Sequence, residues 1–259
     1  MQDLGITPKR SLGQNFLIQP LIVDRILYEL EQQSPNYVIE IGPGLGVLTE
    51  GLISREIPHM LIELDRKFAE LWRVRGENII EMDALKVHWN ELNLPKGTWL
   101  LGNLPYQIGS RLVIDLSQGP GEIFGLMFMF QKEVAQRLTA KESTKEYGFL
   151  SVIAQTFWDI NKVIDASPED FYPSPKVSSR VVKFKRREVD ENIDEKYIAF
   201  VKKAFQHRRK FMMKSFSDHQ EKISRAFTKL NIKATSRAEE LTPEKFQNLY
   251  TAFCSGADR

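Results

Sequence analysis

The stretch YVIEIGPGLG, residues 37–46, decides the fold class of this chain. Its apolar first half, Tyr37–Ile41, is typical of a buried strand, and it runs directly into a glycine-rich turn. A helical pattern follows over Val47–Ser54. A strand, a glycine-rich turn and a helix form the first half of a nucleotide-type binding unit, in which glycines let a ligand approach the backbone closely. The stretch therefore predicts an α/β fold with a ligand at the carboxyl end of this strand.

The spacing of the glycines narrows the choice of ligand. A dinucleotide fingerprint needs G-x-G-x-x-G, whereas here Gly46 comes one residue early and Val47 follows it. This spacing disfavours NAD and FAD. An acidic strand residue, Glu40, followed by G-x-G-x-G is instead a pattern we associate with S-adenosylmethionine, whose amino-acid part the turn would accommodate.

Polar side chains follow the next strands at the point where each one ends. Glu63, 17 residues past Gly46, is placed to accept hydrogen bonds from both ribose hydroxyls of a cofactor. An acid near a helix N-terminus is the alternative for Glu63, and Asp65 is interpreted as the cap of that helix. Asp83 would accept from the adenine amine of the cofactor, and Asn103 follows the fourth strand. The three expected strands are Met60–Leu64, Asn78–Met82 and Trp99–Gly102.

The four residues Asn103, Leu104, Pro105 and Tyr106 suit attack by an exocyclic amine. Proline has no N–H and a fixed φ, so a turn built on it leaves backbone carbonyls free beside the Asn103 amide oxygen. Two acceptors of this kind would hold one adenine N6 amine and localise its lone pair. Tyr106 would then supply a flat face for the base. The alternative is a strand-ending turn with a capping Asn and a core Tyr.

The remainder of the first part of the chain predicts further elements around this sheet. Pro20 opens a helix over Leu21–Leu30, and Gln131–Lys141 is a second expected helix. Residues 149–158 and 160–166 are apolar and favour β structure. Phe171 precedes a stiff loop with two prolines and is interpreted either as a second wall of a base pocket or as a core residue. The strands expected here are Gly125–Phe130, which is a core strand, and Val177–Lys185.

A charged linker over residues 185–192 predicts a domain boundary, with a catalytic domain over 1–188 and a helical RNA-binding domain over 189–259. Residues 1–185 hold 20 Lys and Arg against 23 Asp and Glu, whereas residues 186–259 hold 16 against 11. In the second part, helical spacing places Lys203, His207, Lys210 and Lys214 on one face, with Arg208 and Arg209 beside it. This face would bind a phosphate backbone, or else it is merely solvated.

Composition limits the classes of function. There is one cysteine, Cys254, and the four histidines have no ligand-like spacing, so neither a disulfide nor a metal site is expected. No apolar run approaches the length of a membrane helix, and no signal peptide is evident. We expect a monomeric cytoplasmic protein without a membrane partner.

Eight motifs occur in the order found in the KsgA-type small-subunit ribosomal RNA adenine dimethyltransferases, which this chain resembles over nearly its full length. Each motif is weak alone, but the ordered set is specific. Gln107 and Gly109 replace the usual Asn and Ser, and Ser174 interrupts the usual proline run. The motifs are Leu12–Leu17, Glu40–Gly46, Ile62–Asp65, Asp83–Ala84, Gly102–Tyr106, Gln131–Val134, Phe171–Val177 and Arg208–Lys210.

The resemblance implies a Rossmann-like class I methyltransferase sheet with helices on both faces and a small all-α C-terminal domain. It implies S-adenosylmethionine as methyl donor and, as target, two adjacent adenines in the 3′-terminal hairpin loop of small-subunit ribosomal RNA, within a 30S particle or its precursor. Tyr106 and Phe171 would sandwich the adenine. The positions implied for the cofactor site are Asn15, Leu17, Gly42, Gly44, Glu63, Asp83 and Asn103.

Three other functions are compatible with parts of the pattern. A large-subunit adenine methyltransferase of the antibiotic-resistance type shares the Asn103–Tyr106 motif and differs in its RNA. A non-catalytic ribosome assembly factor would keep the fold without needing the Glu40, Glu63, Asp83 and Asn103 set. A nicotinamide oxidoreductase is disfavoured by the glycine spacing.

Overall fold

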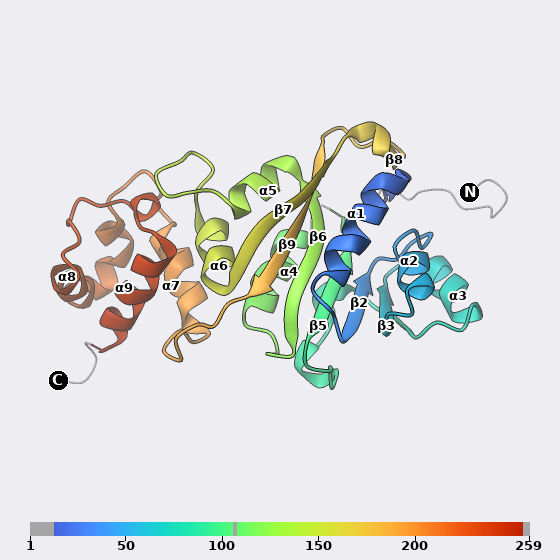
Figure 1. Ribbon diagram of the computed structural model, residues 1–259. Helices are drawn as coiled ribbons and strands as arrows, with labels where there is room; N and C mark the ends of the chain where they lie inside the picture. The colour runs from blue at the N-terminus through green and yellow to red at the C-terminus, as the bar shows by residue number, and fades with distance from the viewer. Residues whose placement is uncertain (1–12, 106–107, 256–259) are drawn as a thin grey trace. The chain divides into compact units, whose positions relative to one another are not determined.

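The computed structural model describes residues 13–105 and 108–255 (Figure 1). The chain divides into two compact units, which we describe separately. The first comprises residues up to Ala135 together with Ile160–Arg186, and the second comprises Gln136–Asp159 together with the residues from Arg187 onward.

The described strands form one large sheet and one small sheet. Seven strands build the large sheet, in the order β4-β3-β2-β5-β6-β9-β7, and β1 pairs with β8 in an antiparallel two-stranded sheet. Five strands of the large sheet, β2 to β6, are parallel, and β9 is antiparallel to β6. The strands are β1 (Phe16–Leu17), β2 (Tyr37–Ile41), β3 (His59–Glu63), β4 (Ile79–Glu81), β5 (Thr98–Gly102), β6 (Ile123–Gln131), β7 (Trp158–Ala166), β8 (Phe171–Tyr172) and β9 (Ser179–Arg186).

The strand order reverses at β2, which lies between β3 and β5. The chain runs outward from β2 through β3 to β4, and it then continues on the other side of β2 with β5 and β6. In an open parallel sheet such a reversal leaves a crevice at the carboxyl ends of the strands, where ligands bind. The glycine turn after β2 and Asn103 after β5 therefore lie at the two sides of one crevice.

Helix α1 (Pro20–Glu31) covers one face of the sheet because its apolar stripe matches the inward side chains of the strands. Ile22, Ile26 and Leu30 on α1 belong to the same buried cluster as Trp99 and Met127 of the sheet. The opposite face carries Leu100, Leu126 and Phe128, which are also buried, as expected for a sheet covered on both sides. The predicted core strand 125–130 is confirmed.

In the described part of the first unit, three α-helices connect successive parallel strands, namely Thr49–Ser54, Arg66–Val74 and Gly109–Ser117, and in the described part of the second unit the regular structure is helical except for the first two residues of β7. The predicted Pro20 start of α1 is confirmed, with proline in its first turn. The α-helices are α1 (Pro20–Glu31), α2 (Thr49–Ser54), α3 (Arg66–Val74), α4 (Gly109–Ser117), α5 (Lys132–Leu138), α6 (Phe149–Phe157), α7 (Lys196–Ala204), α8 (Gln220–Lys229) and α9 (Pro243–Ser255).

The β prediction for residues 149–158 is wrong over most of its length, because Phe149–Phe157 form α6. Periodicity does not separate a buried helix from a buried strand in such an apolar run. Long-range contacts select the helix: Ser151 Oγ donates to the Arg137 carbonyl, and Gln155 Nε2 donates to the carbonyls of Leu138 and Ala140. The neighbouring prediction of a strand over 160–166 is confirmed by β7.

The second unit includes a segment that precedes the predicted 188/189 boundary. Residues 136–159 join this unit because Tyr147 Oη donates to the Leu241 carbonyl at 2.7 Å and Ser143 N donates to the Glu239 carbonyl at 2.8 Å. The observed division between Arg186 and Arg187 lies two residues before the predicted one. Among the residues that the structure describes, no helix is long and apolar enough to cross a membrane.

Arg186, at the end of β9, holds the carboxyl end of α4. Its guanidinium donates to the carbonyls of Leu116, Ser117 and Ile123, at 2.9, 3.4 and 2.7 Å. The last carbonyls of a helix have no partner within the helix, so an arginine fork that reaches them stabilises the helix end.

We expect Arg186→Leu to lower the free energy of unfolding by about 2 kcal/mol, since it removes three hydrogen bonds to carbonyls, of which Leu116 keeps a second donor in Gly119 N. Urea unfolding monitored by circular dichroism measures the change. Arg66→Leu is the control, because Arg66 is exposed at the start of α3 and a surface change of this kind costs at most about 0.5 kcal/mol. Equal stabilities for the two variants would contradict the capping role.

Candidate active site

A cavity of about 270 Å³ lies at the carboxyl ends of the parallel strands. The residues after β2, β3, β4 and β5 form its walls, together with the segment 13–18. The sequence placed polar residues at the ends of these four strands, and the structure brings them into one cavity. All seven positions expected for the cofactor contribute to the lining: Asn15, Leu17, Gly42, Gly44, Glu63, Asp83 and Asn103.

The glycine turn has a backbone conformation that L side chains rarely adopt. Gly42, Gly44 and Gly46 have φ values of +70°, +53° and +88°. A Cβ on Gly42 would meet no atom within 4 Å, so this position faces open space in the cavity wall. A Cβ on Gly46 would lie 1.9 Å from the Trp72 ring, so only glycine permits this close approach.

Trp72, on α3, is a residue that motif reasoning missed. Its indole Nε1 donates to the Gly44 carbonyl at 2.9 Å, and its side chain is fully buried. As predicted, Asp65 caps α3, accepting from Lys67 N at 3.1 Å. Phe68 and Trp72 lie four residues apart on the buried face of this helix, and this spacing is the signal in the sequence that could have identified Trp72. The Trp72 hydrogen bond fixes the peptide between Gly44 and Leu45, while the Gly44 N–H is bound separately by Glu63.

Glu63 lines the cavity with both carboxylate oxygens already hydrogen-bonded to the backbone. Oε2 accepts from Gly44 N at 3.1 Å, and Oε1 accepts from Asp65 N at 2.8 Å. Burial raises the pKa of Glu63, and these hydrogen bonds oppose that rise. A carboxylate has about four lone-pair sites, so capacity remains for the two hydroxyls of a ribose.

Glu40 also lines the cavity, and it is buried more deeply. Its Oε2 accepts from Thr49 Oγ1 at 2.7 Å. Burial raises the pKa of Glu40 to about 8, the Thr49 hydrogen bond opposes this rise, and the nearby Glu63 carboxylate adds to it. Glu40 therefore favours its protonated form at neutral pH.

Asn103 and the segment before β1 are joined across the cavity. Asn103 Nδ2 donates to the Asn15 carbonyl at 2.9 Å, so the amide is oriented and its Oδ1 accepts nothing from the described residues. The Leu104 carbonyl likewise accepts no hydrogen bond from the described residues, whereas the Pro105 carbonyl accepts from Ile108 N at 3.1 Å. Tyr106 lies outside the described residues.

Asp83 and an apolar wall complete the far end of the cavity. Asp83 Oδ1 accepts from Leu85 N at 3.0 Å and caps a short 3-10 helix, while Oδ2 accepts nothing from the described residues. Leu64 and Met82 line the cavity and are 53% and 41% exposed, so they present apolar surface that nothing in the described chain covers. Such a flat apolar wall beside a carboxylate suits a purine with an exocyclic amine.

Phe171 is not among the described residues that line the cavity. It lies in β8, opposite Leu17 of β1, and is 3% exposed within the core cluster beneath α1. It therefore supports the segment that carries Asn15 and Leu17. Its role as a wall of the base pocket stays a prediction.

Two of the departures from the motif pattern, Gly109 and Ser174, lie within the described residues, and each has a local explanation. Gly109, at the first position of α4, packs against Phe130, because a Cβ there would lie 2.8 Å from that ring. Ser174 Oγ donates to the Pro168 carbonyl at 2.7 Å, so a hydrogen bond stabilises the loop where a proline is usual. Gln107 lies outside the described residues, as does Leu12.

The prediction that Lys203, His207, Lys210 and Lys214 share one helical face is wrong, because α7 ends at Ala204. Phe205 stacks on Phe246 with ring centroids 5.7 Å apart, and the chain then turns. Lys203 Nζ is paired with Asp218 Oδ1 at 2.7 Å. Tertiary packing thus overrides the helical spacing.

The members of the predicted RNA-binding set differ in their surroundings. Lys203 is half-buried by its ion pair, and Arg208 is bound to Glu239 and to backbone carbonyls. His207, Arg209 and Lys210 are exposed, and in the described chain their side chains make no hydrogen bond or ion pair. These three remain available for phosphates. No group of three or more metal-binding side chains occurs among the described residues.

We expect Glu40→Gln to gain stability relative to the wild type as pH rises. The raised pKa means that folded protein keeps the Glu40 proton between pH 4.5 and 8 while unfolded protein loses it, so wild-type stability falls across this window. The slope from one such group is at most about 1.4 kcal/mol per pH unit. Gln keeps an acceptor for Thr49 and does not ionise. Urea unfolding of both proteins between about pH 5 and pH 8 measures the difference, and parallel curves would contradict it.

Comparison with known proteins agrees with this geometry. Residues 6–254 match the family model described as ribosomal RNA adenine dimethylase. The ribosomal RNA small subunit methyltransferase A of Bdellovibrio bacteriovorus is 42% identical, over 97% of this chain and 94% of the relative.

Two solved structures share the fold over nearly the full chain. A dimethyladenosine transferase from Plasmodium falciparum has a TM-score of 0.73 and 23% identity, covering 90% of this chain and 95% of that one. The 23S rRNA methyltransferase ErmE has a TM-score of 0.69 and 21% identity, covering 93% and 100%. The sheet is therefore that of a class I methyltransferase. With the family model matching almost the entire sequence, the chain belongs to the ribosomal RNA adenine dimethylase family.

Proposed function

We propose that this protein transfers methyl groups from S-adenosylmethionine to N6 of two adjacent adenines in the 3′-terminal hairpin loop of small-subunit ribosomal RNA. The observation that carries the proposal is the cavity itself, which holds the glycine turn, Glu63, Asp83 and Asn103 in one place. The substrate would be a 30S particle or its precursor, so the reaction belongs to ribosome biogenesis. We propose a monomer acting in the cytoplasm.

The cavity residues fit S-adenosylmethionine both in shape and in the hydrogen-bond acceptors that they offer. Gly42 offers open space where any other residue would place a Cβ. Glu63 would accept from the ribose hydroxyls, and Asp83 Oδ2 from the adenine amine, with Leu64 and Met82 against the ring faces. Asn15 and Leu17 would close the cavity edge. When bound, the cofactor supplies an electrophilic methyl group on a sulfonium.

Asn103 would hold the target amine. Its Nδ2 is occupied by the Asn15 carbonyl, so Oδ1 is turned to accept rather than left to rotate. The Leu104 carbonyl is a second acceptor with no partner in the described chain, whereas Pro105 contributes neither an N–H nor a free carbonyl. One proton of the adenine N6 amine would be bound by each acceptor, which favours a pyramidal nitrogen with a localised lone pair.

These residues would accelerate the reaction by orientation and by charge compensation. Two fixed acceptors stabilise the positive charge that develops on N6, and they need no rearrangement as it develops. The methylated amine then loses a proton that is already acidic, so no strong general base is required. Tyr106 and Phe171 remain proposed as the aromatic walls for the base.

RNA would be bound by the second unit through exposed basic and imidazole side chains. His207, Arg209 and Lys210 are exposed and lack intramolecular partners in the described chain. Arg209 and Lys210 would neutralise phosphates, and the contribution of such side chains falls as salt rises. Lys203, with its ion pair to Asp218, would contribute less.

The large-subunit alternative is distinguished by its RNA. The fold alone does not separate the two, because the solved 23S rRNA methyltransferase ErmE shares it. The 42% identical relative is named a small subunit methyltransferase, which favours 30S. A pure assembly factor would have no use for the oriented Asn103 amide, and the glycine spacing still disfavours a nicotinamide enzyme.

We expect labelled methyl groups to appear as dimethyladenine in 30S subunits from a strain that lacks the modification. In Asn103→Ala the turnover number should fall about 100-fold or more, because one fixed acceptor for the developing charge is lost. Cofactor binding, measured by calorimetry, should fall much less. Asn161→Ala is the control, since Asn161 is exposed on β7 and distant in sequence from every cavity residue.

Label in 50S subunits would establish the large-subunit alternative. Cofactor binding without transfer to either subunit would favour the assembly-factor function. Full activity of Asn103→Ala would refute the proposed role of its amide.

A further inference from the structure

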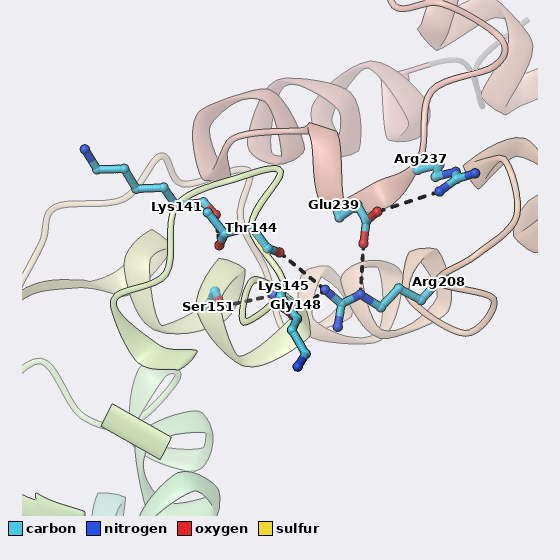
Figure 2. Close-up of polar contacts among 8 residues, drawn as sticks. All are labelled: Lys141, Thr144, Lys145, Gly148, Ser151, Arg208, Arg237 and Glu239. Carbon is cyan, nitrogen blue, oxygen red and sulfur yellow. Dashed lines mark hydrogen bonds and ion pairs between the residues drawn. The ribbon is translucent and has the colours of Figure 1, made fainter. Parts of the chain in front are cut away.

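Arg208 lies in the turn after α7, and its guanidinium is bound within the protein. Figure 2 shows it between Glu239 and the loop that contains Thr144 and Lys145. Nε donates to Glu239 Oε2 at 2.9 Å, and Nη2 donates to the Lys145 carbonyl at 2.6 Å and to the Thr144 carbonyl at 3.4 Å. One side chain thereby joins three separate stretches of the second unit.

The loop over residues 141–148 is held at both ends by other contacts. Ser143 N donates to the Glu239 carbonyl at 2.8 Å, and Tyr147 Oη donates to the Leu241 carbonyl at 2.7 Å. Between these points, residues 144 and 145 are exposed and Arg208 binds their carbonyls. The arginine thus completes a three-point attachment of the loop.

These contacts occupy hydrogen-bond donors of Arg208 and offset its charge, both of which Arg208 would need in order to bind RNA itself. A guanidinium has five N–H donors, and the intramolecular bonds engage Nε and Nη2. The Glu239 carboxylate offsets the positive charge at close range. Arg209 and Lys210, the next two residues, have no such partner in the described chain.

We propose that Arg208 is a positioning residue, which fixes the turn so that Arg209 and Lys210 bind RNA phosphates. This inference rests on the proposed RNA-binding role of the second unit. Arg208 acts through the loop and Glu239, and its own charge contributes little to binding. A role through charge alone and this positioning role make different predictions for two substitutions.

The first substitution is Arg208→Lys, which keeps the charge and loses the planar fork. Lysine does not reach a carboxylate and two carbonyls together, because its three donors radiate from one atom. Positioning by Arg208 predicts roughly tenfold weaker binding to unmodified 30S subunits. A charge-only role predicts little change. Arg225→Lys is the matched control, since Arg225 is 69% exposed on α8 and, among the residues described, its one ion pair is with Glu221 at 3.5 Å.

The second substitution is Glu239→Ala, which removes a negative charge. Electrostatics alone predicts tighter RNA binding, because phosphates would meet a more positive surface. Positioning predicts weaker binding, since the Arg208 side chain loses its anchor. Glu240→Ala is the matched control, because Glu240 is exposed, carries the same charge and has no side-chain partner in the described chain.

Salt dependence separates a positioning residue from a ligand. Arg209→Ala should reduce the slope of log affinity against log salt by about one, as expected when one phosphate contact is lost. Arg208→Lys should weaken binding with the slope unchanged. Amide exchange of Ser143 and its neighbours, measured without RNA, should quicken roughly tenfold in Arg208→Lys and Glu239→Ala, and in neither control.

The inference is overturned if Arg208→Lys binds as the wild type does, if Glu239→Ala binds more tightly, or if the loop amides exchange at wild-type rates. It is supported when both variants bind more weakly and their loops exchange faster. Loss of affinity in Arg208→Lys with an unchanged loop would identify Arg208 as an RNA ligand instead. If Arg209→Ala and Lys210→Ala leave 30S binding unchanged, the proposed RNA surface fails, while the exchange rates still decide whether Arg208 holds the loop.

Discussion

The turn after β2 must reverse direction while presenting its backbone to a cavity, and hydrogen bonds from distant residues make this conformation possible. Trp72 binds the Gly44 carbonyl, and Glu63 binds the Gly44 N–H. Within the turn, Gly46 N donates to the Pro43 carbonyl at 2.8 Å. Positive φ values alone would leave such a turn with many alternatives. The two partners on β3 and α3 select one of them. The cofactor cavity therefore depends on the pairing of β2 with β3 and on the packing of α3.

The same arrangement buries two carboxyl groups, those of Glu40 and Glu63, in the wall of the cavity. Burial raises the pKa of both groups; two backbone N–H donors oppose the rise at Glu63, whereas Glu40 has one hydroxyl donor and a pKa of about 8. The hydrogen-bond donors around the two chemically similar residues thus oppose the effect of burial to different extents. Across the crevice, Asn103 is oriented by the Asn15 carbonyl in a comparable way. Each polar group of the site is held by a neighbour before any ligand arrives, which is the preorganisation that orientation-based catalysis requires.

In the second unit, the number of basic residues overstates the number available to a partner. Lys203 and Arg208 are engaged by Asp218 and Glu239, and only part of the predicted patch is free. Charge counted along the sequence includes cations whose function is to hold the chain together. The helical face expected over 203–214 was wrong for a related reason: aromatic packing of Phe205 on Phe246 ends the regular spacing at Ala204.

The sequence by itself determined the α/β class, most strands of the parallel sheet and the polar residues at their carboxyl ends, because these features are written in local periodicity and in glycine spacing. It also identified Asp65 as a helix cap, which depends on residues close in the chain. Only the tertiary structure decided the strand order around β2, the helical state of residues 149–157, the contact of Trp72 with the glycine turn and the internal binding of Arg208. Periodicity reports which side chains are buried, and it does not report against what they are buried. The partner of a buried or charged group is chosen by contacts between residues far apart in the sequence.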